Sequence, residues 1–129
     1  MINLEFVYLN KEDNKTKAHY SPAVIHEKIV YISGQLPLKK GERVPTSDNI
    51  EDQTRIVLEK LKTILEAANS SIDKVLKTTI YISDVNYWDR VNTVYAEFFG
   101  DHRPARTIVP TKTLHYYCLI ELDAIAFQD

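Results

Sequence analysis

The sequence predicts an α+β fold in which two amphipathic helices cover one face of a mostly antiparallel six-stranded sheet. Two observations support this. Six segments show the alternation or β-branched composition of strands, and two show helical spacing, in the order β-β-β-α-β-α-β-β. A chain of 129 residues can form one hydrophobic core, and its 44% hydrophobic and 26% charged composition argues against disorder. We therefore expect residues 1–129 to form a single domain.

The first part of the chain contains the first three predicted strands. They span residues 3–9, 20–26 and 29–35. Residues 10–17 form a charged loop, and Glu27-Lys28 is a plausible tight turn between the second and third strands. The third strand ends in Ser33-Gly34-Gln35, where the glycine would allow another backbone or a ligand to approach closely.

The first helix is predicted to begin after Asp48 and to run to about Ala68. Asp48 is followed three residues later by Glu51, which is the spacing of a capping box. Apolar residues then recur at helical spacing: Ile50, Val57, Leu58, Leu61, Ile64, Leu65 and Ala68. Asn69 can take the left-handed position that ends a helix.

The middle of the chain predicts a strand and the second helix. Residues 74–82 are apolar and β-branched, as expected of a strand. Asp84 or Asn86 is predicted to cap a helix over residues 87–99, which Gly100 ends. The predicted inner face of this helix carries Trp88, Val91, Asn92, Tyr95, Phe98 and Phe99.

The last two strands are predicted over residues 103–110 and 118–126. Because strand residues alternate between the two faces of a sheet, the final strand has one wholly apolar face: Cys118, Ile120, Leu122, Ala124 and Ala126. This face should pack under the helices. The other face mixes acids with large apolar residues: Leu119, Glu121, Asp123, Ile125 and Phe127. Either it lines a pocket or another chain covers it, and we expect self-association through it.

Composition narrows the function classes. The net charge is −2 and the pI is about 6.1, so there is no basic field for nucleic acid, and a nucleic-acid partner is not expected. The single cysteine, Cys118, excludes an internal disulfide and fits a reducing compartment. No apolar run reaches the roughly 20 residues that span a bilayer, and no secretory signal is evident. We expect a soluble cytoplasmic protein without a membrane partner.

Arg106 and Glu121 are the leading candidates for chemistry, because charged residues within sheet segments are costly to bury without partners. Arg106 could hold a carboxylate through two parallel hydrogen bonds. The alternative is an ordinary salt bridge to Asp101, Asp123 or Glu121. A carboxylate in an apolar pocket has a raised pKa, so Glu121 could orient or deprotonate a water molecule. Its alternative is an interface ion pair.

Other polar residues are open to structural explanations. Asn92 interrupts an apolar helix face and could pin a loop backbone, while Tyr20 and Ser33 offer hydroxyls near strand ends. Cys118 lies on the helix-facing side, which favours an inert core thiol over a nucleophile. The four histidines show no metal-ligand spacing, so no metal site is predicted: His19, His26, His102 and His115.

The ordered set of segments resembles the reactive intermediate deaminase (Rid) family, the RidA or YjgF group. The set includes Ile32-Ser33-Gly34-Gln35-Leu36-Pro37, Pro104-Ala105-Arg106 and Ile120-Glu121-Leu122-Asp123-Ala124-Ile125-Ala126. Ser33-Gly34-Gln35 and Pro104-Ala105-Arg106 are weak signals singly but specific as an ordered set. Together with matching segments at residues 20–24, 64–68, 75–84 and 91–99, they follow the family order over nearly the whole chain.

The resemblance implies a chorismate-mutase-like fold and a homotrimer with a site in each inter-subunit cleft. It also implies cofactor-free hydrolysis of reactive enamines and imines, chiefly 2-aminocrotonate/2-iminobutanoate and 2-aminoacrylate/2-iminopropanoate, to 2-oxo acids and ammonia. Arg106 would clamp the substrate carboxylate, and Glu121 would position the attacking water. The remaining pocket residues would be Tyr20, Ser33, Gly34, Asn92 and Ile108.

The chain differs from the usual family pattern at four places: Ala18-His19, Asn69, Ile108 and His115. These differences bear on substrate preference more than on the reaction. Two other functions stay open at this point. One is a regulatory trimer that binds a small carboxylate without turnover, although binding alone would need only Arg106. The other is an endoribonuclease or translation inhibitor, which the acidic pI disfavours.

Overall fold

The predicted order of strands and helices is confirmed by a computed structural model of the chain, which describes residues 2–10, 12 and 18–129. Most of the loop expected over residues 10–17 lies outside the described residues. The strands are β1 (Glu5–Val7), β2 (Ala23–His26), β3 (Ile29–Gln35), β4 (Val75–Ile82), β5 (Ala105–Pro110) and β6 (Ile120–Phe127). The helices are α1 (Ile50–Ala67) and α2 (Trp88–Phe99), and short 3-10 helices span Ile72–Lys74, Val85–Tyr87 and His115–Tyr117.

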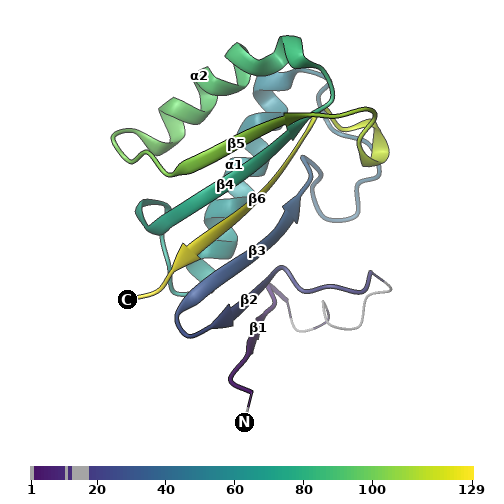
Figure 1. Ribbon diagram of the computed structural model, residues 1–129. Helices are drawn as coiled ribbons and strands as arrows, with labels where there is room; N and C mark the ends of the chain where they lie inside the picture. Colours follow the sequence, from purple (N-terminus) through teal and green to yellow (C-terminus); the bar gives the residue numbers. More distant parts are fainter. Residues whose placement is uncertain (1, 11, 13–17) are drawn as a thin grey trace.

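The six strands form one sheet in the order β1-β2-β3-β6-β4-β5 (Figure 1). Every pair is antiparallel except β4 and β5, which are parallel and are joined through α2. Such a parallel pair needs a crossover connection, and the helix supplies it. The C-terminal strand therefore lies in the middle of the sheet, and β5 forms an edge.

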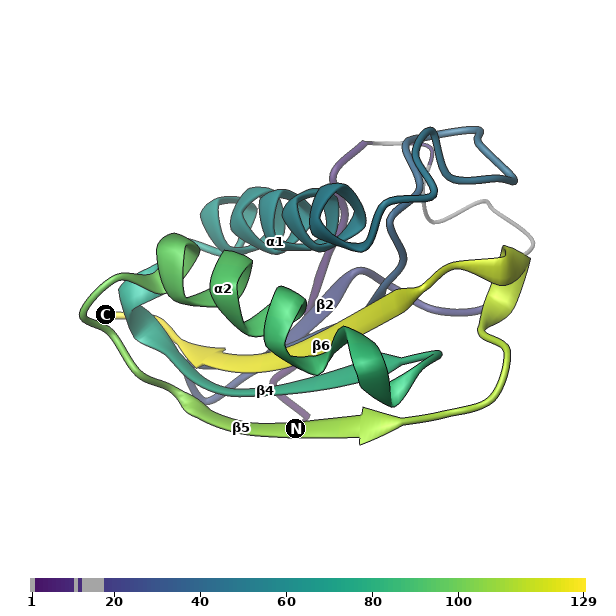
Figure 2. The ribbon, with the colours of Figure 1, turned by 90° about the horizontal axis from the view of Figure 1, so that it is seen from above.

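Both helices lie on the same side of the sheet, as predicted (Figure 2). The apolar face of β6 packs beneath them: Cys118, Ile120, Leu122, Ala124 and Ala126 are each at most 2% exposed. On the opposite face, Phe6, Val24, Tyr31 and Ile125 are neighbours in the register across four strands. Phe6 is 56% exposed and Tyr31 is 47% exposed, so one face of the sheet is left partly apolar and uncovered in a single chain.

The first helix begins one residue later than predicted. Asn49, rather than Asp48, is its N-cap, because the Asn49 side chain accepts a hydrogen bond of 3.0 Å from the backbone N–H of Asp52. The capping box expected between Asp48 and Glu51 is therefore wrong. The expected ending is confirmed: Asn69 has a φ of 56°, and the next N–H, that of Ser70, returns to the carbonyl of Leu65.

The second helix differs from its predicted boundaries at its start. Asp84 caps the short helical turn at Val85–Tyr87 by accepting from the N–H of Asn86, and α2 itself begins at Trp88. Gly100, with a φ of 61°, ends it as expected. The buried face is Val91, Val94, Tyr95 and Phe99, an i, i+3, i+4, i+8 stripe. Asn92 and Trp88 lie beside this stripe and are exposed, so their placement on the inner face was wrong.

Two long-range side-chain contacts position the segments that carry the candidate residues. The side chain of buried Gln53 on α1 accepts a 2.8 Å hydrogen bond from the N–H of Leu119, which holds the start of β6. The Glu51 carboxylate on α1 accepts hydrogen bonds of 2.7 to 3.1 Å from the guanidinium of Arg90 on α2. In the described part of the chain, neither helix is long and apolar enough to cross a membrane.

Candidate active site

Arg106 lies at the edge of the sheet, where one polar and one aromatic side chain hold its guanidinium. It pairs with Thr78 in the register between β4 and β5, so its side chain lies on the helix-covered face. Its Nη1 donates a 2.8 Å hydrogen bond to Oδ1 of Asn92, and its guanidinium lies 4.9 Å from the ring centroid of Tyr95. The Tyr95 hydroxyl is 2.8 Å from the buried Thr78 hydroxyl, which fixes the ring. The guanidinium is therefore oriented before any ligand arrives.

The contacts of Arg106 decide between its two sequence interpretations. In the described part of the chain, Arg106 forms no ion pair with a carboxylate, and the proposed salt bridges to Asp101, Asp123 or Glu121 are wrong for a single chain. Asn92 contacts Arg106 rather than a loop backbone, so its structural explanation is also wrong. Most donors of the guanidinium remain available, because only one N–H is used by Asn92.

A cavity of about 470 Å³ opens beside Arg106, between the C-terminal part of α2 and the start of β5. Arg106, Asn92 and Tyr95 line it, and so do His102 and Arg103. None of its lining residues is acidic. The cavity is therefore suited to an anion.

Glu121 lies on the other face of the sheet. It pairs with Tyr81 in the register between β6 and β4, and it is half-buried. Burial raises the pKa of the Glu121 carboxyl, the negative charge of Asp123 raises it further, and His115 opposes the shift. Asp123 accepts a 3.3 Å hydrogen bond from the Tyr81 hydroxyl, whereas no described residue donates one to Glu121. Glu121 is therefore the better proton acceptor of the two acids.

Gly34 lies against Glu121, and Ser33 ties the segment after Tyr20 to the same strand. The Ser33 hydroxyl donates a 2.7 Å hydrogen bond to the carbonyl of Ser21, so the segment after Tyr20 is tied to β3. Tyr20 and Gly34 line a cavity of about 680 Å³ together with His115 and Tyr116, whose ring centroids lie 3.8 Å apart with the ring planes tilted by 34°. A Cβ added at Gly34 would overlap the Glu121 carboxylate, which explains why glycine is needed there.

Replacing Gly34 with alanine is expected to displace the Glu121 carboxylate. Its φ does not lie in the left-handed region, so the backbone tolerates alanine and the clash must be relieved by the flexible end of Glu121. We expect a loss of at most about 1 kcal/mol in the free energy of unfolding, the low end of the cost of overpacking, because the clashing atoms end a flexible, half-buried side chain. Urea unfolding of a double-mutant cycle with Glu121→Ala measures this, because in that background Gly34→Ala should cost little. An equal cost in both backgrounds would contradict the contact.

The sequence-predicted residues thus fall into two separate groups, in which Arg106 and Glu121 lie on opposite faces of the sheet. Arg106 and Asn92 form one group, and buried Ile108 follows on the same face as Arg106. Tyr20, Ser33, Gly34 and Glu121 form the other. Arg106 lies opposite Thr78 and Glu121 opposite Tyr81, three residues apart on β4 and therefore of opposite orientation. Two strand spacings separate them as well, about 10 Å.

A single chain therefore does not bring Arg106 and Glu121 to one reacting centre. The edge strand β5 carries the arginine group, and an edge strand offers unpaired backbone donors and acceptors. The partly apolar sheet face lies on the glutamate side. A site that uses both charges needs a second copy of the chain.

Other candidates are settled by burial. Cys118 is 1% exposed and burial raises the pKa of its thiol, so it is a core residue, as favoured from the sequence. Over residues 2–10, 12 and 18–129, no cluster of three or more histidine, cysteine or acidic side chains could hold a metal ion.

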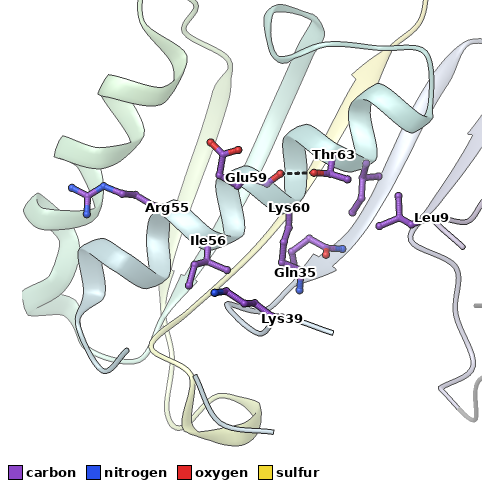
Figure 3. A pocket seen from close by; sticks show the side chains of 9 residues that line it. Leu9, Gln35, Lys39, Arg55, Ile56, Glu59, Lys60 and Thr63 are labelled. Carbon is purple, nitrogen blue, oxygen red and sulfur yellow. Dashed lines mark hydrogen bonds between the residues drawn. The ribbon is translucent and has the colours of Figure 1, made fainter. Parts of the chain in front are cut away.

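A further cavity of about 410 Å³ lies against α1 (Figure 3). Lys60 from α1 and Gln35 from β3 both line it, together with Leu9 and Ile56. The Lys60 ammonium donates to the carbonyls of Leu36 and Leu38 at 2.8 and 2.9 Å, so it holds the chain after β3. This explains the half-buried lysine without a ligand.

Three residues at the site were missed from the sequence. The sequence placed Tyr95 only on the inner face of its helix, but its ring also lies against the Arg106 guanidinium. Its position three residues after Asn92 could have indicated this, because residues three apart on a helix are neighbours. Arg103 and Tyr116 line the two cavities. No spacing rule identified them, because Arg103 lies in the connection between α2 and β5, and Tyr116 lies in the short 3-10 helix before β6.

Comparisons with known proteins agree over most of the chain. A family model described as endoribonuclease L-PSP matches residues 11–128. The chain is 45% identical over 112 residues to the RutC family protein PH0854 of Pyrococcus horikoshii, with 85% of this chain and 87% of that protein covered.

Two solved structures are similar over most of their length. YyfA of the Rid protein family from Yersinia pestis has a TM-score of 0.87 at 33% identity, covering 97% of this chain and 99% of that one. TdcF of E. coli, solved with bound serine, has a TM-score of 0.80 at 32% identity, covering 88% and 91%. These proteins share the fold of this chain.

Proposed function

Because the chain belongs to the Rid family, also called the RutC, YjgF or L-PSP family, we propose that it hydrolyses small 2-imino acids to 2-oxo acids and ammonia. The substrates are 2-aminocrotonate/2-iminobutanoate and 2-aminoacrylate/2-iminopropanoate. The observation that carries the proposal is Arg106, an oriented guanidinium with no carboxylate partner among the described residues. Such a group binds a substrate carboxylate through paired N–H donors.

The reaction needs little beyond charge neutralisation and water placement. The water oxygen adds to the electrophilic imine carbon while Glu121 takes a proton from the water and returns it to the imine nitrogen, which gives a carbinolamine. The hydroxyl proton of the carbinolamine then passes through Glu121 to the nitrogen as the C–N bond breaks, which releases ammonia and leaves the 2-oxo acid. No oxidant or reductant is required. A glutamate whose pKa is raised by burial accepts and returns a proton more readily near neutral pH.

The two residue groups meet in this proposal across a subunit interface. Arg106, Asn92 and the backbone near Ile108 come from one copy, and Tyr20, Ser33, Gly34 and Glu121 come from the next. A closed ring of three copies would form three such clefts. The uncovered apolar row from Phe6 to Ile125 supports an association through this sheet face.

TdcF with bound serine supports a small carboxylate as the ligand, and it leaves a binding-only function as the second candidate. Glu121 favours catalysis, because binding the carboxylate requires Arg106 alone. The net charge of −2 argues against an endoribonuclease.

The direct test couples threonine dehydratase to the trapping of 2-iminobutanoate by semicarbazide. Added wild-type protein should lower the semicarbazone formed and raise the rate of 2-oxobutanoate and ammonia release, because hydrolysis competes with trapping. A folded protein that binds 2-oxobutanoate but leaves trapping unchanged would support the binding-only function. RNA affinity at physiological ionic strength would instead favour the endoribonuclease.

A further inference from the structure

The cavity beside Arg106 carries more positive charge than one carboxylate requires. Arg103 lines it together with Arg106 and His102, and no acidic residue does. In the described part of the chain, Arg103 makes no hydrogen bond or ion pair, and its side chain is exposed. His102 is already engaged, because its Nε2 lies 2.7 Å from the carbonyl of Val75 and its ring packs near Phe99. Arg103 is therefore a second cation of this cavity, beside Arg106, that has no acidic partner among the described residues.

We propose that the site takes 2-imino acids that carry a second carboxylate, and that Arg103 binds this distal group. Arg106 would hold the carboxylate next to the imine carbon. The inference rests on the proposed function, since it names the substrate class of the same site. The hydrolysis is unchanged: water adds to the imine carbon, ammonia leaves, and the distal carboxylate takes no part.

The charges around the two residue groups determine where the distal carboxylate lies. Glu121 and Asp123 lie on the same face of β6. In the proposed site, the copy of the chain that supplies Glu121 therefore presents negative charge to the substrate. A second carboxylate is repelled from that side and attracted toward Arg103. The cavity of about 470 Å³ has room for a five-carbon chain in that direction. Pro104 restricts the backbone between Arg103 and β5, which limits the positions that the guanidinium can reach.

A competing explanation is that Arg103 stabilises α2. The helix ends at Gly100, and a positive charge just beyond a helix C-terminus interacts favourably with its dipole. This explanation predicts that losing Arg103 lowers thermal stability and affects all substrates equally. The proposal predicts a loss confined to dicarboxylic substrates.

The test compares two imines of equal length. L-amino-acid oxidases generate 2-iminoglutarate from glutamate and 2-iminopentanoate from norvaline, with catalase removing peroxide, and semicarbazide trapping reports hydrolysis of each. In the wild type we expect a higher kcat/KM for 2-iminoglutarate. Arg103→Gln should lower that value about five- to tenfold, the scale of one partly exposed charged contact, and leave 2-iminopentanoate unchanged. Arg103→Lys should restore part of the loss.

Lys62→Gln is the matched control, because Lys62 is exposed on α1 and lies outside this cavity. It removes the same charge and should change neither imine. Equal kcat/KM for the two imines in the wild type, or equal losses for both in Arg103→Gln, would overturn the proposal.

A binding measurement separates this inference from the proposed function. Calorimetry with the stable products 2-oxoglutarate and 2-oxopentanoate does not depend on turnover. We expect 2-oxoglutarate to bind about five- to tenfold more tightly to the wild type, and the two to bind alike in Arg103→Gln. If neither imine is hydrolysed but this preference is present, the deaminase function fails and the Arg103 contact stands. If 2-iminopentanoate is hydrolysed without any preference in binding, only the inference fails.

Discussion

Replacing Glu121 with glutamine is expected to lower kcat for imine hydrolysis by about 10²- to 10⁴-fold, the usual contribution of a general base. Glutamine has the same size and should fit against Gly34, but its amide cannot accept the proton of the attacking water. The proposed contact between Arg106 and the substrate is not altered by this substitution, so KM should change little. The measurement is steady-state hydrolysis of 2-iminobutanoate under semicarbazide competition. A rise in KM with unchanged kcat would contradict a role in water activation.

The pH profile provides a second readout for Glu121. The group must be ionised to accept a proton, and burial together with Asp123 raises its pKa above the usual range for glutamate. As the pH falls through this raised value, Glu121 is protonated and kcat/KM falls. The acid limb should therefore lie at higher pH than for an exposed glutamate, and it should vanish in Glu121→Gln.

Asp123→Asn is the matched control for this profile. It removes the neighbouring negative charge that raises the Glu121 pKa and keeps the size of the side chain. The acid limb should then move to lower pH without a large loss of activity at neutral pH. If the acid limb of the kcat/KM profile stays at the same pH in both Glu121→Gln and Asp123→Asn, a group other than Glu121 is responsible for it.

Replacing Arg106 with alanine is expected to lower kcat/KM about a hundredfold, because a charged, paired hydrogen bond to the substrate carboxylate is lost. KM should rise, in contrast to Glu121→Gln. Arg106→Lys should recover only part of the activity, since lysine lacks the planar fork. Arg106 is exposed at the sheet edge, so the thermal midpoint should change little. Unchanged kinetics in a folded Arg106→Ala protein would contradict the proposed binding of the substrate carboxylate by Arg106.

Mixing the two inactive variants tests the inter-subunit site. When Arg106→Ala and Glu121→Gln chains assemble together, about one site in four should combine an intact Arg106 from one copy with an intact Glu121 from the next. Activity in co-refolded mixtures should rise well above the residual activity of each variant alone. Light scattering should show a trimer. A monomer, or mixtures without activity, would contradict a site shared between copies.

Much of the fold could be predicted because it depends on local chemistry. The alternation of β6 predicted which of its faces is buried, since strand side chains must point to opposite sides. Asn69 and Gly100 predicted two helix ends, because both positions have positive φ. The start of α1 was placed one residue early, because Ser47, Asp48 and Asn49 are all good caps and only the folded geometry selects Asn49. Asn92 was misplaced for a similar reason, at the border of an apolar stripe.

The sequence by itself determined the element order, the family resemblance and the residues that carry the candidate chemistry, because these follow from residue types and spacing. Only the tertiary structure decided how those residues are grouped. The alternation of β6 already placed Glu121 on the face away from the helices. The face that Arg106 takes and its position relative to Glu121 depend instead on the pairing of β5 and β6 with β4, which no local pattern encodes. The same register brings Arg106 onto Tyr95 and places Glu121 against Gly34. Long-range pairing, rather than any motif, therefore separates the two charges and makes a second copy of the chain necessary for a shared site.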